Sequence, residues 1–202
     1  MLKEKSKATL AARVISTLFV PPSLLIIIFT FFAFYYEQSF INKMTVLAVS
    51  YIFGFISPTI MFFYFRKKGK IIDLDASVKE ERTVPYFIAV LTFIVGWIIL
   101  VFFKVNIVTS SFWFCYISNT LIVIFINKHW KISAHALGVA GPLGAITFSI
   151  GPKGLFFLAL LLMVGWSRIE LKRHTLAQVI AGSVLGFTLT YFQMSLIISN
   201  FK

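Results

Sequence analysis

Long apolar stretches alternate with short polar ones along almost the whole chain. Five of these stretches have the length of a membrane-spanning helix, which takes about 20 residues; 134–150 is marginal and 154–166 is short. In chain order the stretches cover residues 14–36, 44–65, 85–103, 107–126, 134–150, 154–166 and 175–199. The pattern predicts an all-α, polytopic transmembrane bundle of six or seven spans, folded as one domain over residues 1–202.

Proline and glycine predict where these helices bend and turn. The string Gly151-Pro152-Lys153-Gly154 separates the two weakest stretches, so we expect them to form a tight hairpin. Pro21-Pro22 is expected to kink the first stretch. Basic residues precede that stretch, as in a signal peptide, but it is too long and lacks a small-residue cleavage site, which indicates a retained span.

Composition excludes the soluble classes. Apolar residues make up 59% of the 202 residues, mean hydropathy is +0.91 and only 13% of residues are charged. A chain of this size cannot bury so much apolar surface in one core. Disordered, collagen-like and disulfide-rich chains are excluded as well. The only cysteine, Cys115, lies inside an apolar stretch and is interpreted as a packing residue.

The positive charge is unevenly distributed over the polar segments. With seven spans, the N-terminus and the segments 66–84, 127–133 and 167–173 share one side of the membrane and carry 15 of the 19 Lys and Arg residues. Short loops rich in Lys and Arg stay in the cytoplasm. We therefore expect this face to be cytoplasmic, with the N-terminus inside, and attribute the net charge of +12 to the bilayer rather than to nucleic acid.

Two of the three histidines, His135 and His174, occupy helix starts on this same face, near Ser133 and Arg168. One histidine alone would be read as a satisfied interfacial residue. Two imidazoles, a guanidinium and a hydroxyl at the edge of a membrane core favour a functional site instead, because ionisable groups are costly there.

The segment around His174 suggests a nucleophile beside a phosphate site. Arg168 offers a fork of donors that matches phosphate oxygens. Gln178 stands one helical turn after His174, so its carbonyl can accept a hydrogen bond from one ring nitrogen. The other ring nitrogen would then be unprotonated and face outward as a nucleophile.

The segment Lys131-Ile132-Ser133-Ala134-His135 opens another helix. The free N–H groups at its start, near Ala134, and its positive dipole end predict an anion site. Ser133 adds a hydroxyl donor, and His135 is placed to give a proton to a leaving oxygen.

These residues resemble the type-2 phosphatidic acid phosphatase superfamily of membrane lipid phosphatases. Its third motif reads Ser-Arg, five residues, His, three residues, Asp, and here Ser167, Arg168 and His174 match while Gln178 stands in place of the Asp. Its second motif, Pro-Ser-Gly-His, is matched at two of four positions by Ile132-Ser133-Ala134-His135. The resemblance covers about the last 75 residues well.

The family's first motif, Lys, six residues, Arg-Pro, is degenerate here. The nearest string is Lys79-Glu80-Glu81-Arg82-Thr83-Val84-Pro85, in which Lys79 and Arg82 share a face if the segment is helical. Two apparent spans separate this string from Ser133, whereas the family keeps its first two motifs in one loop. We leave two interpretations open: substrate-binding residues or solvated cytoplasmic charges.

The resemblance implies a metal-independent phosphatase that hydrolyses a lipid phosphate or diphosphate, such as a prenyl diphosphate or a phosphatidylglycerophosphate-like lipid, through a phosphohistidine on His174. It implies His135 and Gln178 as further catalytic residues, and Arg168, Ser133, Ala134, Lys79 and Arg82 as substrate-binding residues. No cofactor is expected. Two alternatives remain: a phosphoryl or head-group transferase on the same scaffold, and a non-catalytic lipid-binding or transport protein.

Two further strings receive structural interpretations. Asp73 and Asp75 invite a metal site, but a surface loop is the better interpretation because no second carboxylate cluster would complete a hard-cation site. Gly182-Ser183-Val184-Leu185-Gly186 allows close helix approach and is expected to serve packing within the chain rather than dimerisation. The expected partners are the lipid phosphate and membrane lipids, and the sequence does not set the oligomeric state.

Overall fold

The computed structural model describes residues 6–73 and 78–200, and every regular element within them is helical. Helices α3, η1 and α4 follow one another without interruption, as do α7, η3 and α8. The elements are α1 (Lys7–Leu18), α2 (Pro21–Tyr36), α3 (Phe40–Val49), η1 (Ser50–Ile56), α4 (Ser57–Lys67), η2 (Glu80–Arg82), α5 (Thr83–Phe102), α6 (Ile107–His129), α7 (Ala134–Ile150), η3 (Gly151–Phe157), α8 (Leu158–Glu170) and α9 (Leu176–Asn200).

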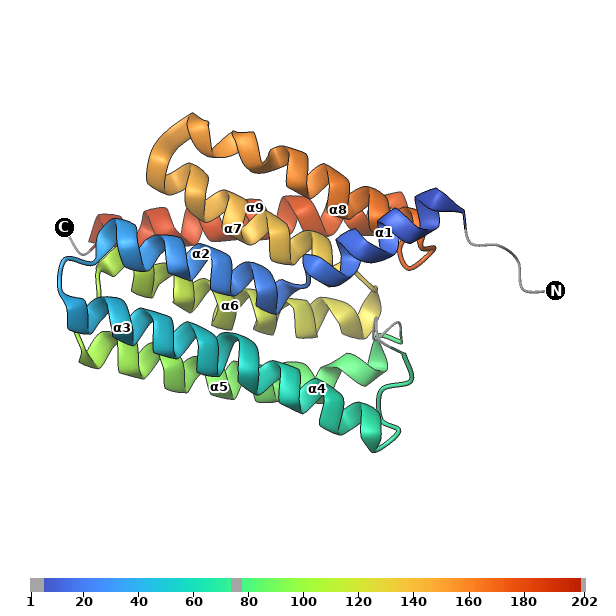
Figure 1. The fold of residues 1–202 in the computed structure, drawn as a ribbon, viewed down its shortest axis with the longest axis horizontal. Coiled ribbons are helices and arrows are strands. Elements are labelled where there is room, and N and C mark those ends of the chain that lie inside the picture. Colours follow the sequence, from blue (N-terminus) through green and yellow to red (C-terminus); the bar gives the residue numbers. More distant parts are fainter. Residues whose placement is uncertain (1–5, 74–77, 201–202) are drawn as a thin grey trace.

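The helices lie roughly side by side along the long axis of the molecule (Figure 1). The polar segments meet at one end, called here the basic end, formed by residues 6–16, 66–73, 78–82, 127–135 and 167–178. Lys79 Nζ donates to the backbone oxygen of Lys128, and Lys131 Nζ donates to that of Arg173. The polar segments therefore meet at one end of the bundle, and the expectation that this end lies on one side of a membrane stays a prediction.

Both predicted breaks are present. Helices α1 and α2 are bent by 54° relative to each other, and Pro21 begins the second. Helix α7 ends at Ile150, where Gly151 takes a φ of +72°, and the chain doubles back through η3 into α8 (Figure 1). A Cβ on Gly154 would lie 2.7 Å from the Cα of Thr147, so this tight return requires glycine.

Five helical stretches of the described residues are long and apolar enough to cross a membrane, and the bent α1–α2 pair would make a sixth. One of the five, Ala134–Glu170, contains the hairpin and counts as two spans where both limbs cross. These helices have the lengths and compositions of a multi-pass membrane protein. The finer expectation of six or seven crossings stays a prediction.

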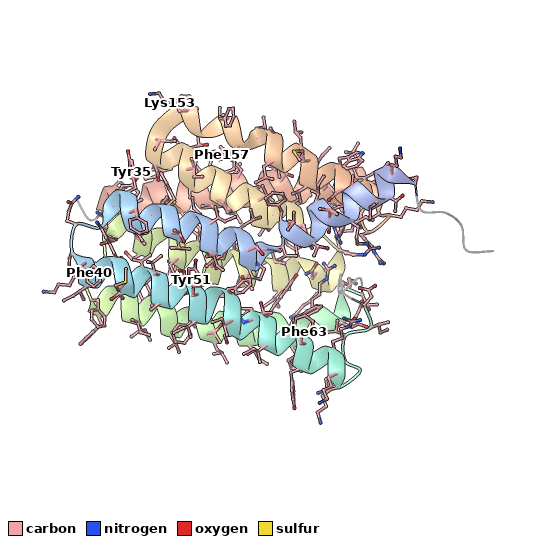
Figure 2. All side chains as sticks on the ribbon, viewed as in Figure 1. Tyr35, Phe40, Tyr51, Phe63, Lys153 and Phe157 are labelled. Carbon is pink, nitrogen blue, oxygen red and sulfur yellow. The ribbon has the colours of Figure 1, made fainter. Side chains whose placement is uncertain are left out.

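Large apolar side chains cover the outside of the bundle. Tyr35, Phe40, Tyr51, Phe63 and Phe157 project outward from their helices in Figure 2 and are exposed. A surface of this kind suits hydrocarbon rather than water.

Inside, an aromatic cluster joins α2, α5 and α6. Phe29 stacks on Phe112 and meets Trp113 edge to face. A small polar network joins α6 to α9, in which Asn119 Nδ2 donates to Thr190 Oγ1 at 3.0 Å and Gln193 Nε2 donates to Asn119 Oδ1 at 3.1 Å. Interhelical hydrogen bonds of this kind stabilise membrane helix packing.

The sequence pattern does not reveal the π-helical segment η1. Residues 44–65 read as one apolar run, yet the backbone hydrogen bonds follow the wider π-helical pattern over Ser50–Ile56. At this place Gly54 faces Leu25 of α2, and a Cβ on Gly54 would lie 2.2 Å from the Leu25 side chain. The missing side chain at Gly54 therefore lets η1 approach α2 closely.

Candidate active site

His174 lies in the turn between α8 and α9 and is only 7% exposed. Its Nδ1 lies 3.0 Å from Gln178 Oε1. The same amide oxygen accepts the backbone N–H of Thr175 at 3.3 Å, which identifies it as oxygen rather than nitrogen. Nδ1 is therefore the protonated ring nitrogen, and Nε2 carries the lone pair. The expected contact between His174 and Gln178 is present.

Burial and positive neighbours keep the His174 ring neutral. Burial lowers the pKa of His174 from 6.5 to about 3, and the charges of Lys131 and Arg82 act in the same direction. The hydrogen bond to Gln178 opposes this shift. Burial, followed by Arg82 and Arg168, also lowers the pKa of Lys131. At neutral pH the imidazole is thus in the form that a nucleophile requires.

Ser133 is fully buried and caps the start of α7. Its Oγ accepts the backbone N–H of Ala136 at 3.3 Å, and its own backbone N–H donates to the carbonyl oxygen of Gln178 at 3.2 Å. Helix α9 lies close to the start of α7 here: a Cβ on Gly182 would lie 2.7 Å from the backbone carbonyl oxygen of Ser133. The glycine string therefore packs α9 on α7, as predicted. The starts of both helices are held together at the site.

Arg168 is 1% exposed near the C-terminal end of α8. Its Nη1 donates to the Ser16 hydroxyl of α1. Its carbonyl oxygen accepts the backbone N–H groups of Arg173 and His174 at 3.0 and 3.3 Å. Arg168 thus fixes the turn that carries His174 and adds positive charge beneath it.

The structure separates the two candidates for the first motif. Arg82 is 4% exposed and donates from Nη1 to the carbonyl oxygen of Ile132 at 3.3 Å, immediately before Ser133. Lys79 instead donates to the carbonyl oxygen of Lys128 at 2.9 Å and lies 3.8 Å from Glu80 Oε1. Arg82 is therefore brought to the histidines, whereas Lys79 lies over the C-terminal end of α6.

A cavity of about 470 Å³ brings the site residues together. His174, His135, Ala134 and Arg82 line its polar end. Ser133, Arg168, Gln178 and Lys79 are not among the described residues that line it. Ser133 and Gln178 hold lining residues in place through the contacts described above, as does Arg168. His135 is half-buried on the first turn of α7.

Three residues at this site were not identified from the sequence. Arg13 of α1 lines the cavity, Ser16 accepts the hydrogen bond from Arg168, and Lys131 lowers the pKa of His174. Arg13 and Ser16 lie more than 100 residues from the second and third motifs, so the spacing of the motifs does not point to them. Lys131 adjoins the second motif, and its charge beside Ser133 was the available clue.

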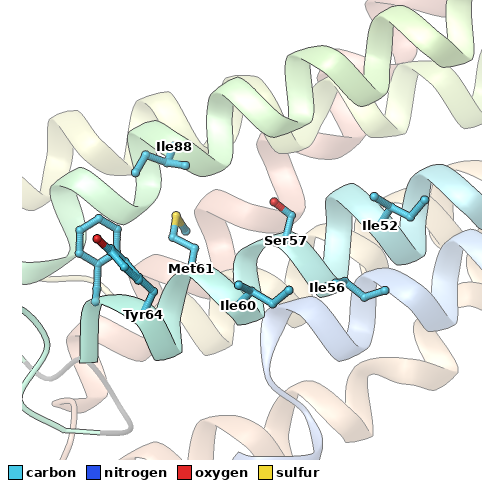
Figure 3. Close-up of a pocket in the computed structure, with 8 residues that line it drawn as sticks. Ile52, Ile56, Ser57, Ile60, Met61, Tyr64 and Ile88 are labelled. Atoms are coloured by element: carbon cyan, nitrogen blue, oxygen red, sulfur yellow. The ribbon is translucent and has the colours of Figure 1, made fainter. Parts of the chain in front are cut away.

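Two other features were considered as sites: the loop that carries Asp73, and a second groove, which is mainly apolar. Asp73 Oδ2 lies 3.4 Å from Arg173 Nη1, and Asp75 lies outside the described residues. Figure 3 shows an apolar groove, where Ile52, Ile56, Ile60 and Met61 lie opposite Ile88 of α5. Ser57 and Tyr64 are the only polar side chains of that groove within the described part of the chain.

Comparison of the chain with known family models, with curated proteins and with solved structures finds no match.

Proposed function

We propose that this protein is a membrane phosphatase that hydrolyses a lipid phosphate or diphosphate through a phosphohistidine on His174. One observation carries the proposal: a buried, neutral imidazole with its Nδ1 held by Gln178 lines a cavity with Arg82 and His135. Beyond these groups the cavity walls become apolar, which suits a substrate with a charged head and a hydrocarbon tail.

In the first step, His174 Nε2 donates its lone pair to the substrate phosphorus, and the bond from phosphorus to the lipid oxygen breaks. His135 gives a proton to the departing lipid oxygen, so an alcohol or a lipid monophosphate leaves. The positive charge that forms on the His174 ring is shared with the Gln178 amide oxygen through the Nδ1–H.

In the second step, His135 accepts a proton from water, and the water oxygen attacks the phosphorus. The bond from phosphorus to Nε2 breaks and its electron pair returns to His174. Inorganic phosphate is released, and both histidines return to their starting protonation states.

Positive groups stabilise the charge that develops on the phosphoryl oxygens. Arg82 supplies guanidinium donors at the cavity wall, and the backbone N–H groups at the start of α7 near Ala134 supply a helix dipole. Arg168 adds charge from behind the His174 turn. Ser133 orients the first turn of α7, and Lys79 contributes at most at long range.

These roles follow the pattern of the type-2 phosphatidic acid phosphatase superfamily, and we propose that the chain is a divergent member. The excess of Lys and Arg at the basic end supports a cytoplasmic site. Such a site favours newly made substrates, including prenyl diphosphates or a phosphatidylglycerophosphate-like lipid.

The test is release of inorganic phosphate from a panel of lipid phosphates by the purified protein in lipid nanodiscs, with EDTA present. Wild type is expected to release phosphate and His174→Ala is not. His129→Ala is the matched control, because His129 is exposed at the end of α6. Equal release by wild type and His174→Ala would refute the phosphohistidine, and phosphoryl transfer to an added alcohol would indicate the transferase.

A further inference from the structure

The same cavity extends far below the site. Arg82 lies at its polar end and Phe93 is the lining residue farthest along α5. These residues are 11 positions apart, which is about 16 Å along a helix at 1.5 Å per residue. That depth is about half of the ~30 Å hydrocarbon thickness of a bilayer. The cavity is therefore about one leaflet deep.

An aromatic floor closes the deep end. Tyr116 is the lining residue farthest along α6 from the basic end, and its ring centroid lies 5.7 Å from that of Phe93. Phe29 and Phe112 pack against the Tyr116 ring from behind. Trp113 Nε1 donates to the Phe93 carbonyl oxygen at 2.7 Å, which holds α5 against α6 at this level. The Tyr116 hydroxyl is buried without a hydrogen-bond partner in the described part of the chain.

The cavity also reaches the outer surface of the bundle. Phe63 of α4 lines it and is 54% exposed, and Figure 2 shows this side chain projecting outward. Across from α4, the wall is formed by Val20 and Pro21 at the bend between α1 and α2. A cavity lined both at this bend and by an exposed side chain of α4 would let a hydrocarbon chain enter from the side of the bundle without crossing water.

We propose that this cavity holds one hydrocarbon tail of the substrate, drawn from the leaflet that the site faces, and that Tyr116 and Phe93 form the floor that limits tail length. The inference rests on the proposed function, since the charged head lies at His174. Three features favour a tail as occupant: charge confined to one end, apolar walls, and a depth of one leaflet. The floor limits tail length through the volume of the two rings. The Tyr116 hydroxyl makes no hydrogen bond in the described part of the chain, so no hydrogen bond is expected to contribute.

The test uses n-alkyl phosphates of increasing length in nanodiscs, with kcat/KM measured for each. Because the tail is already dissolved in the bilayer, kcat/KM per mole of nanodisc lipid is expected to vary little with tail length until the tail reaches the floor and to fall beyond it. Tyr116→Ala should move this limit to longer tails. Tyr116→Phe should keep the wild-type limit, and Tyr51→Ala, an exposed residue on η1, serves as the matched control.

The converse variant is Ala89→Leu. Ala89 lines the cavity one turn above Phe93, so a larger side chain should shorten the accepted tail. This variant also decides the question if Tyr116→Ala does not fold. If kcat/KM depends on tail length in the same way in wild type and in a folded Tyr116→Ala or Ala89→Leu protein, the proposal that Tyr116 and Phe93 limit tail length is refuted.

Binding separates failure of this inference from failure of the proposed function. The affinity of n-alkyl phosphonates, which are not hydrolysed, is measured for His174→Ala and for the same protein carrying Tyr116→Ala. A shift of the preferred length between the two supports the tail cavity even where no phosphate is ever released. The same preferred length in both would refute it even for an active phosphatase.

Discussion

Gln178 holds the imidazole of His174 through a hydrogen bond of 3.0 Å between Oε1 and Nδ1. The amide can orient the ring, but it carries no negative charge to stabilise an imidazolium. Together with burial and the charges of Lys131, Arg82 and Arg168, this leaves a ring whose pKa is about 3. The ring is therefore uncharged at neutral pH, and a positive charge that developed on it would be poorly compensated.

Replacing Gln178 with Asp is therefore expected to preserve or raise turnover. A carboxylate at hydrogen-bond distance raises the pKa of a histidine by about 1–3 units, which leaves His174 largely neutral at pH 7.5. The imidazolium formed during phosphoryl transfer would be better stabilised. The measurement is kcat against pH for both proteins. A loss of turnover across the whole range would contradict the role given to Gln178.

The low pKa of His174 also predicts that acid destabilises the protein. The unfolded chain binds a proton on this ring below about pH 6.5, whereas the folded protein resists until about pH 3. Stability is therefore lost as the pH falls through this window, by on the order of a few kcal/mol. Thermal unfolding of wild type and His174→Gln at pH 7 and pH 4.5 checks this. The variant should lose less stability on acidification, and equal losses would show that the ring does not titrate this way.

Arg82, rather than Lys79, is expected to serve the proposed reaction. Arg82→Lys retains the charge but removes the planar fork at the cavity wall. We expect kcat/KM to fall by about 10²-fold to 10³-fold, which is the scale of losing one positioned hydrogen-bond donor to the developing charge. Lys79→Met is the comparison, with an expected loss below about tenfold. Thermal unfolding of both variants checks that they fold, because Arg82 also supports the Ile132 carbonyl. A larger loss for Lys79→Met would reverse the assignment.

Three glycines, Gly144, Gly182 and Gly186, allow α7 and α9 to approach closely, and Gly182 is the one beside Ser133. A Cβ on Gly182 would lie 2.7 Å from the backbone oxygen of Ser133, which cannot move without shifting the site. Gly182→Ala is expected to destabilise the protein by about 1–3 kcal/mol and to lower activity. Gly141 on α7 is the matched control, because its added Cβ would meet only Thr190 Oγ1 at 3.4 Å. Unfolding midpoints of the two variants provide the measurement, and equal midpoints would exclude the close contact.

Membrane orientation can be measured with single cysteines. Cys115 is buried, so it gives little background. Lys172 is exposed near His174, and Lys153 is exposed at the tip of the hairpin. An impermeant thiol reagent is expected to label Lys153→Cys in intact cells and Lys172→Cys only after permeabilisation. The opposite pattern would place the site outside the cytoplasm.

Local sequence rules predicted the parts of the fold that depend on local chemistry. The bend at Pro21, the reversal at Gly151 and the contact between His174 and Gln178 each follow from residues within one or two turns of one another. The gathering of polar segments at one end followed from the alternation of spans. In each case the sequence itself contains the cause.

Packing between distant helices was not predictable in this way. The proximity of Arg82 to Ile132 depends on how η2 meets the start of α7. No rule of sequence spacing predicts that Arg82, rather than Lys79, makes this contact. The contribution of α1 was hidden for the same reason, because Ser16 and Arg168 are 152 residues apart. The widened turn η1 has no marker in a run of apolar residues.

The pairing of Ser16 with Arg168, together with the hydrogen bond from Thr9 to Glu170, ties the first described helix to the eighth. During synthesis α1 leaves the ribosome long before its partner, and His174 and α9 follow later still. A nascent chain therefore carries Arg13 and Arg82 long before it carries His174, so the lining of the cavity cannot be complete until the turn after α8 has been made. A chain that stops before Arg168 would leave the Ser16 hydroxyl of α1 without this hydrogen-bond donor and the cavity without His174.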